Sequence, residues 1–124
     1  MNVVDSSGWL EYFAAGANAD FFADAIRDTN QLVVPTLSIY EVFKRVLGLR
    51  GKDDALQVTA QMQQGKIVDL DTQLALEAAR LSTEYKLPMA DSIILATARA
   101  YDAKLWTQDA DFKGLPNVMY TGKP

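Results

Sequence analysis

The chain of 124 residues contains no cysteine and no histidine. These two absences exclude disulfide bonds, zinc sites built from thiolates or imidazoles, serine-histidine triads and cysteine nucleophiles. The lack of cysteine is also compatible with a reducing cytosol. Any hydrolytic chemistry in this protein must therefore use carboxylates and hydroxyl groups.

Long apolar runs and an excess of positive charge are absent as well. The hydrophobic stretches are short and interrupted by charged residues, and the first residues lack the basic start and apolar run of a secretory signal. We therefore expect a cytoplasmic protein with no membrane partner. Sixteen acidic residues against twelve basic ones give a net charge of -4, which has the wrong sign for nonspecific phosphate binding. Binding of nucleic acid would need local basic groups.

The composition is that of a globular protein, with 49% hydrophobic and 23% charged residues, and the length predicts one domain over residues 1–124. Short β-prone runs alternate with helical patterns along the chain. The predicted strands are residues 2–4, 32–35, 66–68, 105–107 and 118–120. The predicted helices are residues 6–13, 21–28, 37–48, 56–65, 72–85 and 90–101.

This alternation predicts parallel strands joined by right-handed crossovers. The expected fold is therefore α/β, an open doubly wound, mostly parallel sheet of four to five strands flanked by helices. The helix over residues 90–101 has almost no polar face, so we expect it deep in the protein. In such sheets, binding sites form beyond the carboxyl ends of the strands.

Four acids are predicted at that edge. Asp5 directly follows the first strand, and Asp109 comes one residue after the strand 105–107. Glu41 lies about a turn and a half into the helix after the second strand, and Asp91 lies in the first turn of the apolar helix. Carboxylates in contact repel one another by about 1 to 4 kcal/mol per pair in a wet site, and Mg²⁺ or Mn²⁺ removes this cost. Convergence of the four would indicate a metal site.

Each acid also has a structural explanation. Asp5 could simply cap the helix 6–13. Thr36 or Ser38 could cap the following helix, and Glu41 stands three residues after Ser38, the spacing of a capping box.

The remaining acids have similar alternatives. Asp91 complements the dipole of its helix, although no lysine or arginine lies nearby in the sequence to pair with it. Asp109 could be a turn residue, and for Asp111 a turn role fits better than a functional one.

Four segments carry these acids: Val3–Ser7, Tyr40–Val42, Leu87–Ala98 and Leu105–Phe112. Together they resemble the ordered motifs of PIN-domain ribonucleases, most closely the VapC-like toxins of toxin-antitoxin pairs. The resemblance extends over residues 2–120. Its most specific part is a P-x-x-D-x-x-I-x-A-T-A block followed by T-x-D-x-D-F.

The resemblance implies a set of acids that binds Mg²⁺ or Mn²⁺ and acts in catalysis: Asp5, Glu41, Asp91 and Asp109, with Asp111 as a possible fifth. It implies that the hydroxyl groups of Ser6 and Thr107 support these ligands. The implied activity is that of an endoribonuclease that hydrolyses phosphodiester bonds of tRNA, rRNA or mRNA with metal-activated water and leaves a 5′-phosphate. Such chemistry needs no histidine.

The densest basic stretch begins one turn beyond Glu41. Its members, Lys44, Arg45, Arg50 and Lys52, could bind RNA phosphates beside the acids. A solvated helix face or a salt bridge to Glu41 is an equally good interpretation. The resemblance also implies a homodimer and a VapB-like antitoxin with a segment in a hydrophobic groove.

Aromatic side chains at helical spacing mark the first two helices: Trp9, Tyr12, Phe13, Phe21 and Phe22. Residues in this pattern are more often core or subunit interface than base-stacking platforms. We favour an interface over stacking.

Two other functions compete with the nuclease. A receiver-type signalling domain would have a phosphoacceptor aspartate and Mg²⁺, but it needs paired acids after the first strand, where Asp5 is followed by Ser6 and Ser7. It also needs a lysine after the strand 105–107, and none is there. The second alternative is a catalytically silent PIN-like module that only binds RNA or an antitoxin.

Overall fold

The computed structural model describes residues 1–124 and contains five short strands, six α-helices and two 3-10 helices. In chain order they are β1 (Asn2–Val4), α1 (Ser6–Phe13), α2 (Ala19–Arg27), η1 (Thr29–Gln31), β2 (Val33–Pro35), α3 (Thr36–Arg50), α4 (Lys52–Met62), β3 (Lys66–Val68), α5 (Thr72–Tyr85), α6 (Met89–Ala100), β4 (Lys104–Thr107), η2 (Ala110–Phe112) and β5 (Val118–Tyr120).

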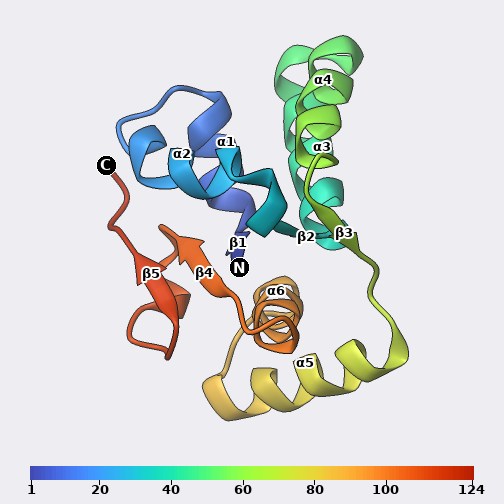
Figure 1. The fold of residues 1–124 in the computed structure, drawn as a ribbon, viewed down its shortest axis with the longest axis vertical. Coiled ribbons are helices and arrows are strands. Elements are labelled where there is room, and N and C mark those ends of the chain that lie inside the picture. Colours follow the sequence, from blue (N-terminus) through green and yellow to red (C-terminus); the bar gives the residue numbers. More distant parts are fainter.

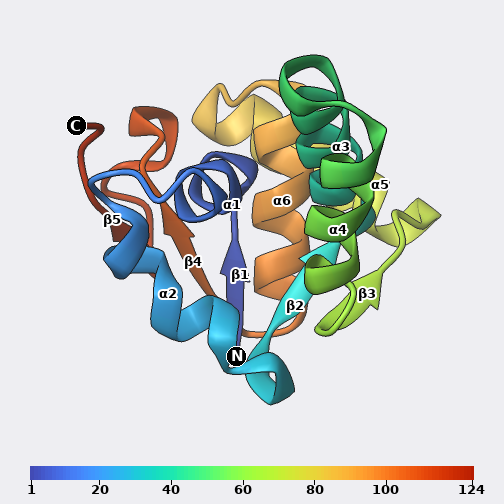
Figure 2. The ribbon, with the colours of Figure 1, turned by 90° about the horizontal axis from the view of Figure 1, so that it is seen from above.

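All strand pairs are parallel, and β1 lies in the middle of the sheet. The order β1-β4-β5 forms one hydrogen-bonded set and β2-β3 another, and a parallel bridge between Asn2 and Leu32 joins the two. Figure 2 shows β4 and β2 on either side of β1, with β5 and β3 outermost. The predicted α/β fold with a parallel sheet is confirmed. Because Val4 pairs with Trp106, the residues that follow these two strands lie side by side.

Helices cover both faces of the sheet (Figure 1), with α1 to α4 on one side and α5 and α6 on the other. Each side has its own buried apolar cluster. In α6, all seven residues from Ser92 to Ala98 are buried, as expected for a helix without a polar face. This burial fixes the beginning of α6, and therefore Asp91, against the sheet.

The expected capping of α3 is wrong. Strand β2 passes directly into the helix, so that Pro35 is the N-cap residue and no side chain caps the helix. Thr36 and Ser38 consequently lie inside the first turn, and the buried Ser38 hydroxyl has no hydrogen-bond partner. The capping-box explanation of Glu41 is therefore wrong as well.

The helix boundaries around residue 50 also differ from the prediction. The helix α3 continues through Gly48 to Arg50, and α4 begins at Lys52, four residues before the expected start. The break falls at Gly51, whose φ of 90° lies in a region that glycine adopts without steric cost. None of the helices combines the length and apolarity needed to cross a membrane.

The aromatic residues of α1 and α2 mainly form core. Trp9 and Phe22 are 0% exposed, and Tyr12, Phe13 and Phe21 pack against the same cluster. The expectation of an interface is wrong for Trp9 and Phe22, because residues with no exposed surface cannot contact a partner.

Candidate metal centre

Asp5 is the most buried acid, with 3% of its surface exposed. Its Oδ1 atom accepts hydrogen bonds from Ser7 Oγ (2.8 Å) and from the backbone N–H of Gly8 (3.0 Å). Its Oδ2 atom accepts a bond from Thr107 Oγ1 (2.8 Å) at the end of β4. The first two bonds are those of a helix cap, but capping leaves the bond to Thr107 unexplained. Asp5 is therefore held by two elements distant in sequence.

Thr107 connects Asp5 with the acids that follow β4. Its side chain is fully buried, and Oγ1 also accepts a hydrogen bond from the backbone N–H of Asp109 (2.9 Å). The carboxylate of Asp109 in turn accepts from the backbone N–H of Asp111 (2.9 Å). A single hydroxyl group thus fixes Asp5 relative to Asp109.

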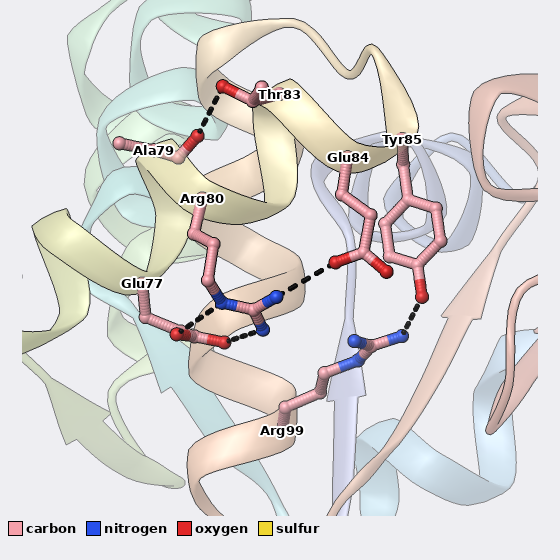
Figure 3. Close-up of polar contacts among 7 residues, drawn as sticks. All are labelled: Glu77, Ala79, Arg80, Thr83, Glu84, Tyr85 and Arg99. Atoms are coloured by element: carbon pink, nitrogen blue, oxygen red, sulfur yellow. Dashed lines mark hydrogen bonds and ion pairs between the residues drawn. The ribbon is translucent and has the colours of Figure 1, made fainter.

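Three carboxylates meet directly at this edge of the sheet. Oxygen atoms of Asp91, Asp109 and Asp111 all lie within 4.8 Å of one another. The ion pairs of the protein lie elsewhere, on α5, where Arg80 bridges Glu77 and Glu84 (Figure 3). The three aspartates therefore have no basic partner, and their oxygen atoms are the donors that Mg²⁺ and Mn²⁺ prefer.

The electrostatics of the site favour binding of a proton or a cation. Burial, followed by the charge of Asp109 and the proximity of Asp111, raises the pKa of Asp91 to about 7. Burial also raises the pKa of Asp5 to about 6, against the opposing effect of its hydrogen bonds from Ser7, Thr107 and Gly8. Both shifts show that the charged forms are costly without a counterion, so the donor set fits a divalent cation.

Glu41 lies beside this group but outside it. Its Oε1 atom accepts a hydrogen bond of 2.6 Å from Ser6 Oγ. Because Ser6 directly follows Asp5, this bond places the Glu41 carboxylate near the end of β1. It forms no ion pair with Lys44 or Arg45, so the salt-bridge alternative is wrong.

The structure thus relates the predicted ligands in two ways. It brings Asp91, Asp109 and Asp111 together directly, while Thr107 connects Asp5 to Asp109 and Ser6 connects Glu41 to the end of β1. Asp111, for which the sequence favours a turn role, lies in the 3-10 turn η2 and also in the group of three.

The predicted basic residues are all exposed, and three of them line hollows of the surface. Lys44 and Arg45 line a cavity of about 500 Å³ together with Glu41. Arg45 and Arg50 line a second cavity of about 500 Å³ between α1, α3 and α4. Lys52 lines neither of them.

Sequence reasoning missed one polar network beside the acids. Gln108, which is 7% exposed, accepts a hydrogen bond from Asn18 Nδ2 (2.9 Å) and donates to the backbone oxygen of Ser7 (3.4 Å). Asn18 Nδ2 also donates to the backbone oxygen of Gly122 (2.8 Å). The only signal in the sequence is the position of Gln108 between two predicted site residues. The network ties the turn after α1 and the residues after β5 to the carboxyl edge of the sheet.

Comparison with solved structures shows the same fold in toxin-antitoxin proteins. A toxin-antitoxin complex from Klebsiella pneumoniae has a chain 23% identical, with 96% of each chain covered and a TM-score of 0.82. VapC20 from Mycobacterium tuberculosis, described as a toxin that cleaves the sarcin-ricin loop, is 16% identical, with a TM-score of 0.76 and coverage of 94% of this chain and 95% of that chain. A chain of DNA-bound VapBC from Salmonella typhimurium is 14% identical, with a TM-score of 0.73 and coverage of 98% of this chain and 96% of that chain.

At the level of sequence, no curated protein matches the chain. The family model described as PIN domain, however, matches residues 3–118. This match spans β1 to the beginning of β5 and includes every acid of the candidate site. The chain therefore belongs to the PIN-domain family.

Proposed function

We propose that this protein is a cytoplasmic, Mg²⁺- or Mn²⁺-dependent endoribonuclease and the toxin of a VapBC-type toxin-antitoxin pair. The observation that carries the proposal is the convergence of Asp91, Asp109 and Asp111, without a basic partner, beside the buried Asp5. Membership of the PIN-domain family supports it, as does the fold shared with VapC20, a toxin described as cleaving the sarcin-ricin loop.

The ligands proposed for the cation are Asp5, Glu41, Asp91 and Asp109, with Asp111 as a further candidate. When bound, a divalent cation lowers the pKa of a water ligand and offsets the charge of a phosphate. The protein's own contribution is orientation. Thr107 holds Asp5 and the backbone of Asp109 in place, and Ser6 holds Glu41.

The basic residues of α3 are proposed to hold the RNA backbone. Lys44 and Arg45 lie in the helical turn after Glu41 and line the same cavity as its carboxylate. They can therefore contact phosphates next to the cut bond, while Arg50 and Lys52 can contact phosphates further along the strand.

The cavity between α1, α3 and α4 is proposed to receive the antitoxin. Its apolar lining includes Leu10, Phe13, Val46, Leu49 and Val58. A peptide segment with apolar side chains would bury this surface. The solved structures that share the fold include VapBC complexes, which supports a protein partner. The proposed assembly is a homodimer, as the resemblance implies.

Two substitutions test the nuclease. Protein freed of antitoxin is expected to cut cellular RNA with Mg²⁺ or Mn²⁺, and EDTA should stop the reaction. Asp5→Asn and Asp91→Asn should abolish cleavage, because each removes the charge of a proposed ligand with little change in volume. Gel analysis of RNA measures the activity, and circular dichroism checks that the variants are folded.

The matched control is Asp24→Asn, because Asp24 is an exposed acid on α2 outside the site. This variant should cut RNA like the wild type. Undiminished cleavage by Asp91→Asn would overturn the assignment. Absence of cleavage by the wild type would favour the silent binding module. Membership of the PIN-domain family leaves the receiver alternative without support.

A further inference from the structure

We propose that Tyr40 is a stacking platform for one RNA base beside the cut bond. This inference rests on the proposed function and adds a contact with a base to the phosphate contacts of Lys44 and Arg45. It comes from an aromatic side chain whose position the folded core does not explain.

Tyr40 is the one exposed aromatic residue of the protein. The residue is 60% exposed, whereas every other phenylalanine, tyrosine and tryptophan is buried or partly buried. Exposure of a large apolar ring is unfavourable, and the cation-π contact with Lys44 in the next turn of α3 is weak at an exposed site.

The surroundings of Tyr40 match a nucleotide. The ring lines the cavity of about 500 Å³ that also contains Glu41, Lys44, Arg45, Gly48 and Leu49. The Lys44 Nζ atom lies 5.8 Å from the ring centroid. An aromatic face beside two cationic groups provides stacking for a base and charge for its phosphate.

The location connects the cavity with the acids. Glu41, the next residue along α3, accepts the hydrogen bond from Ser6, and Ser6 follows Asp5. A base on Tyr40 would therefore lie close to a phosphate held at the carboxyl edge of the sheet. A single-stranded nucleotide fits this cavity better than an apolar peptide, because Lys44 and Arg45 line it beside the ring and can hold a phosphate.

The test uses a short single-stranded RNA that contains a cut mapped with the wild-type protein. We expect Tyr40→Leu to raise KM about tenfold, the size of one lost base-aromatic contact, and to leave kcat nearly unchanged. Tyr40→Phe keeps the ring and should behave like the wild type. The control is Tyr101→Leu, which removes a tyrosine that also lies under a lysine, Lys66, at 5.1 Å, but at the opposite end of the sheet.

A second RNA, with an abasic nucleotide beside the cut, separates stacking from other roles of Tyr40. At one of the two positions that flank the cut, removal of the base should raise the KM of the wild type about tenfold. With this RNA, Tyr40→Leu should raise KM no further, because the abasic nucleotide and the substitution remove the same stacking contact. An unchanged KM for Tyr40→Leu, or additive losses at both positions, would overturn the proposal. So would a change in the oligomeric state of Tyr40→Leu by light scattering, since the ring would then belong to a protein interface. If no RNA is cut by the wild type, the proposed function itself fails.

Discussion

Asp5 and Asp91 each bind a proton more tightly than an ordinary aspartate, with pKa values of about 6 and about 7. Burial is the main cause in both cases, and neighbouring carboxylates add to it. An unfolded chain offers neither burial nor close carboxylates, so these two residues release their protons at lower pH after unfolding.

This difference predicts that the metal-free protein loses stability as the pH rises. Between the ordinary pKa of aspartate, near 4, and the raised values, the folded state binds more protons than the unfolded state, so the free energy of unfolding must fall with pH. Because one pKa unit corresponds to about 1.4 kcal/mol, the two shifts together correspond to a loss of several kcal/mol by about pH 8. Urea unfolding in EDTA at several pH values measures it.

Two comparisons check this explanation. Asp91→Asn should reduce the pH dependence to the part that Asp5 contributes, because the asparagine does not titrate. Millimolar Mn²⁺ at about pH 8 should raise the melting temperature of the wild type more than that of Asp5→Asn. Equal shifts would mean that Asp5 does not share a metal pocket with the other acids.

At the level of residues, sequence position predicts the location of the acids better than their partners. Asp5 and Asp109 lie at the carboxyl edge because they follow strands within one or two residues, and Asp91 does so because it lies in the first turn of α6. The hydrogen bond from Ser6 to Glu41 depends on how α1 and α3 pack against each other, which no local pattern encodes. The same holds for Asn18 and Gln108, which are ninety positions apart in sequence.

At the level of elements, the close approach of α1 to the sheet depends on Gly8. A Cβ atom at this position would lie 2.6 Å from the ring of Phe22 and 2.7 Å from the side chain of Val4. The N–H group of Gly8 also donates to Asp5. Displacement of α1 would therefore disturb packing and the candidate site together.

We predict that Gly8→Ala lowers the free energy of unfolding by about 1 to 3 kcal/mol, the usual cost of overpacking a core. The control is Gly48→Ala within α3, where a Cβ atom meets nothing within 4 Å. This change should stabilise the protein by about 0.5 to 1 kcal/mol, because alanine is the better helix former. Urea unfolding measures both variants, and a neutral Gly8→Ala would show that α1 can move without cost.

The helical spacing of apolar residues predicts all six helices, but it predicts their first and last residues less well. Gly48 resembles a stop signal, yet the helix passes through it and breaks at Gly51. Pro35 ends β2 and also serves as the N-cap of α3, a double role that the sequence does not reveal.

At the level of the whole molecule, the net charge of -4 means that RNA can be attracted only where basic residues gather. The stretch from Lys44 to Lys52 provides four such residues and no acid. Each phosphate neutralised on a single strand contributes a slope of about -0.7 to the dependence of log K on log salt. Binding of RNA should therefore show a slope no steeper than about -3.

Anisotropy titrations of labelled RNA with the Asp91→Asn protein measure this slope without cleavage. Arg45→Ala should reduce it in magnitude by about 0.7, because one phosphate contact is lost. Arg80→Ala, on the opposite side of the sheet and already paired with Glu77 and Glu84, should leave it unchanged. A slope insensitive to Arg45 would remove α3 from the RNA path.

The parallel order of the sheet has a consequence for synthesis of the protein. The central strand β1 leaves the ribosome first, but its neighbour β4 follows about a hundred residues later, since Asp5 and Thr107 are 102 positions apart. A polypeptide that stops before Lys104 lacks the hydroxyl group that holds Asp5, and it lacks Asp109 and Asp111 as well. Fragments that end before Lys104 would therefore lack the cation site that the proposed nuclease needs.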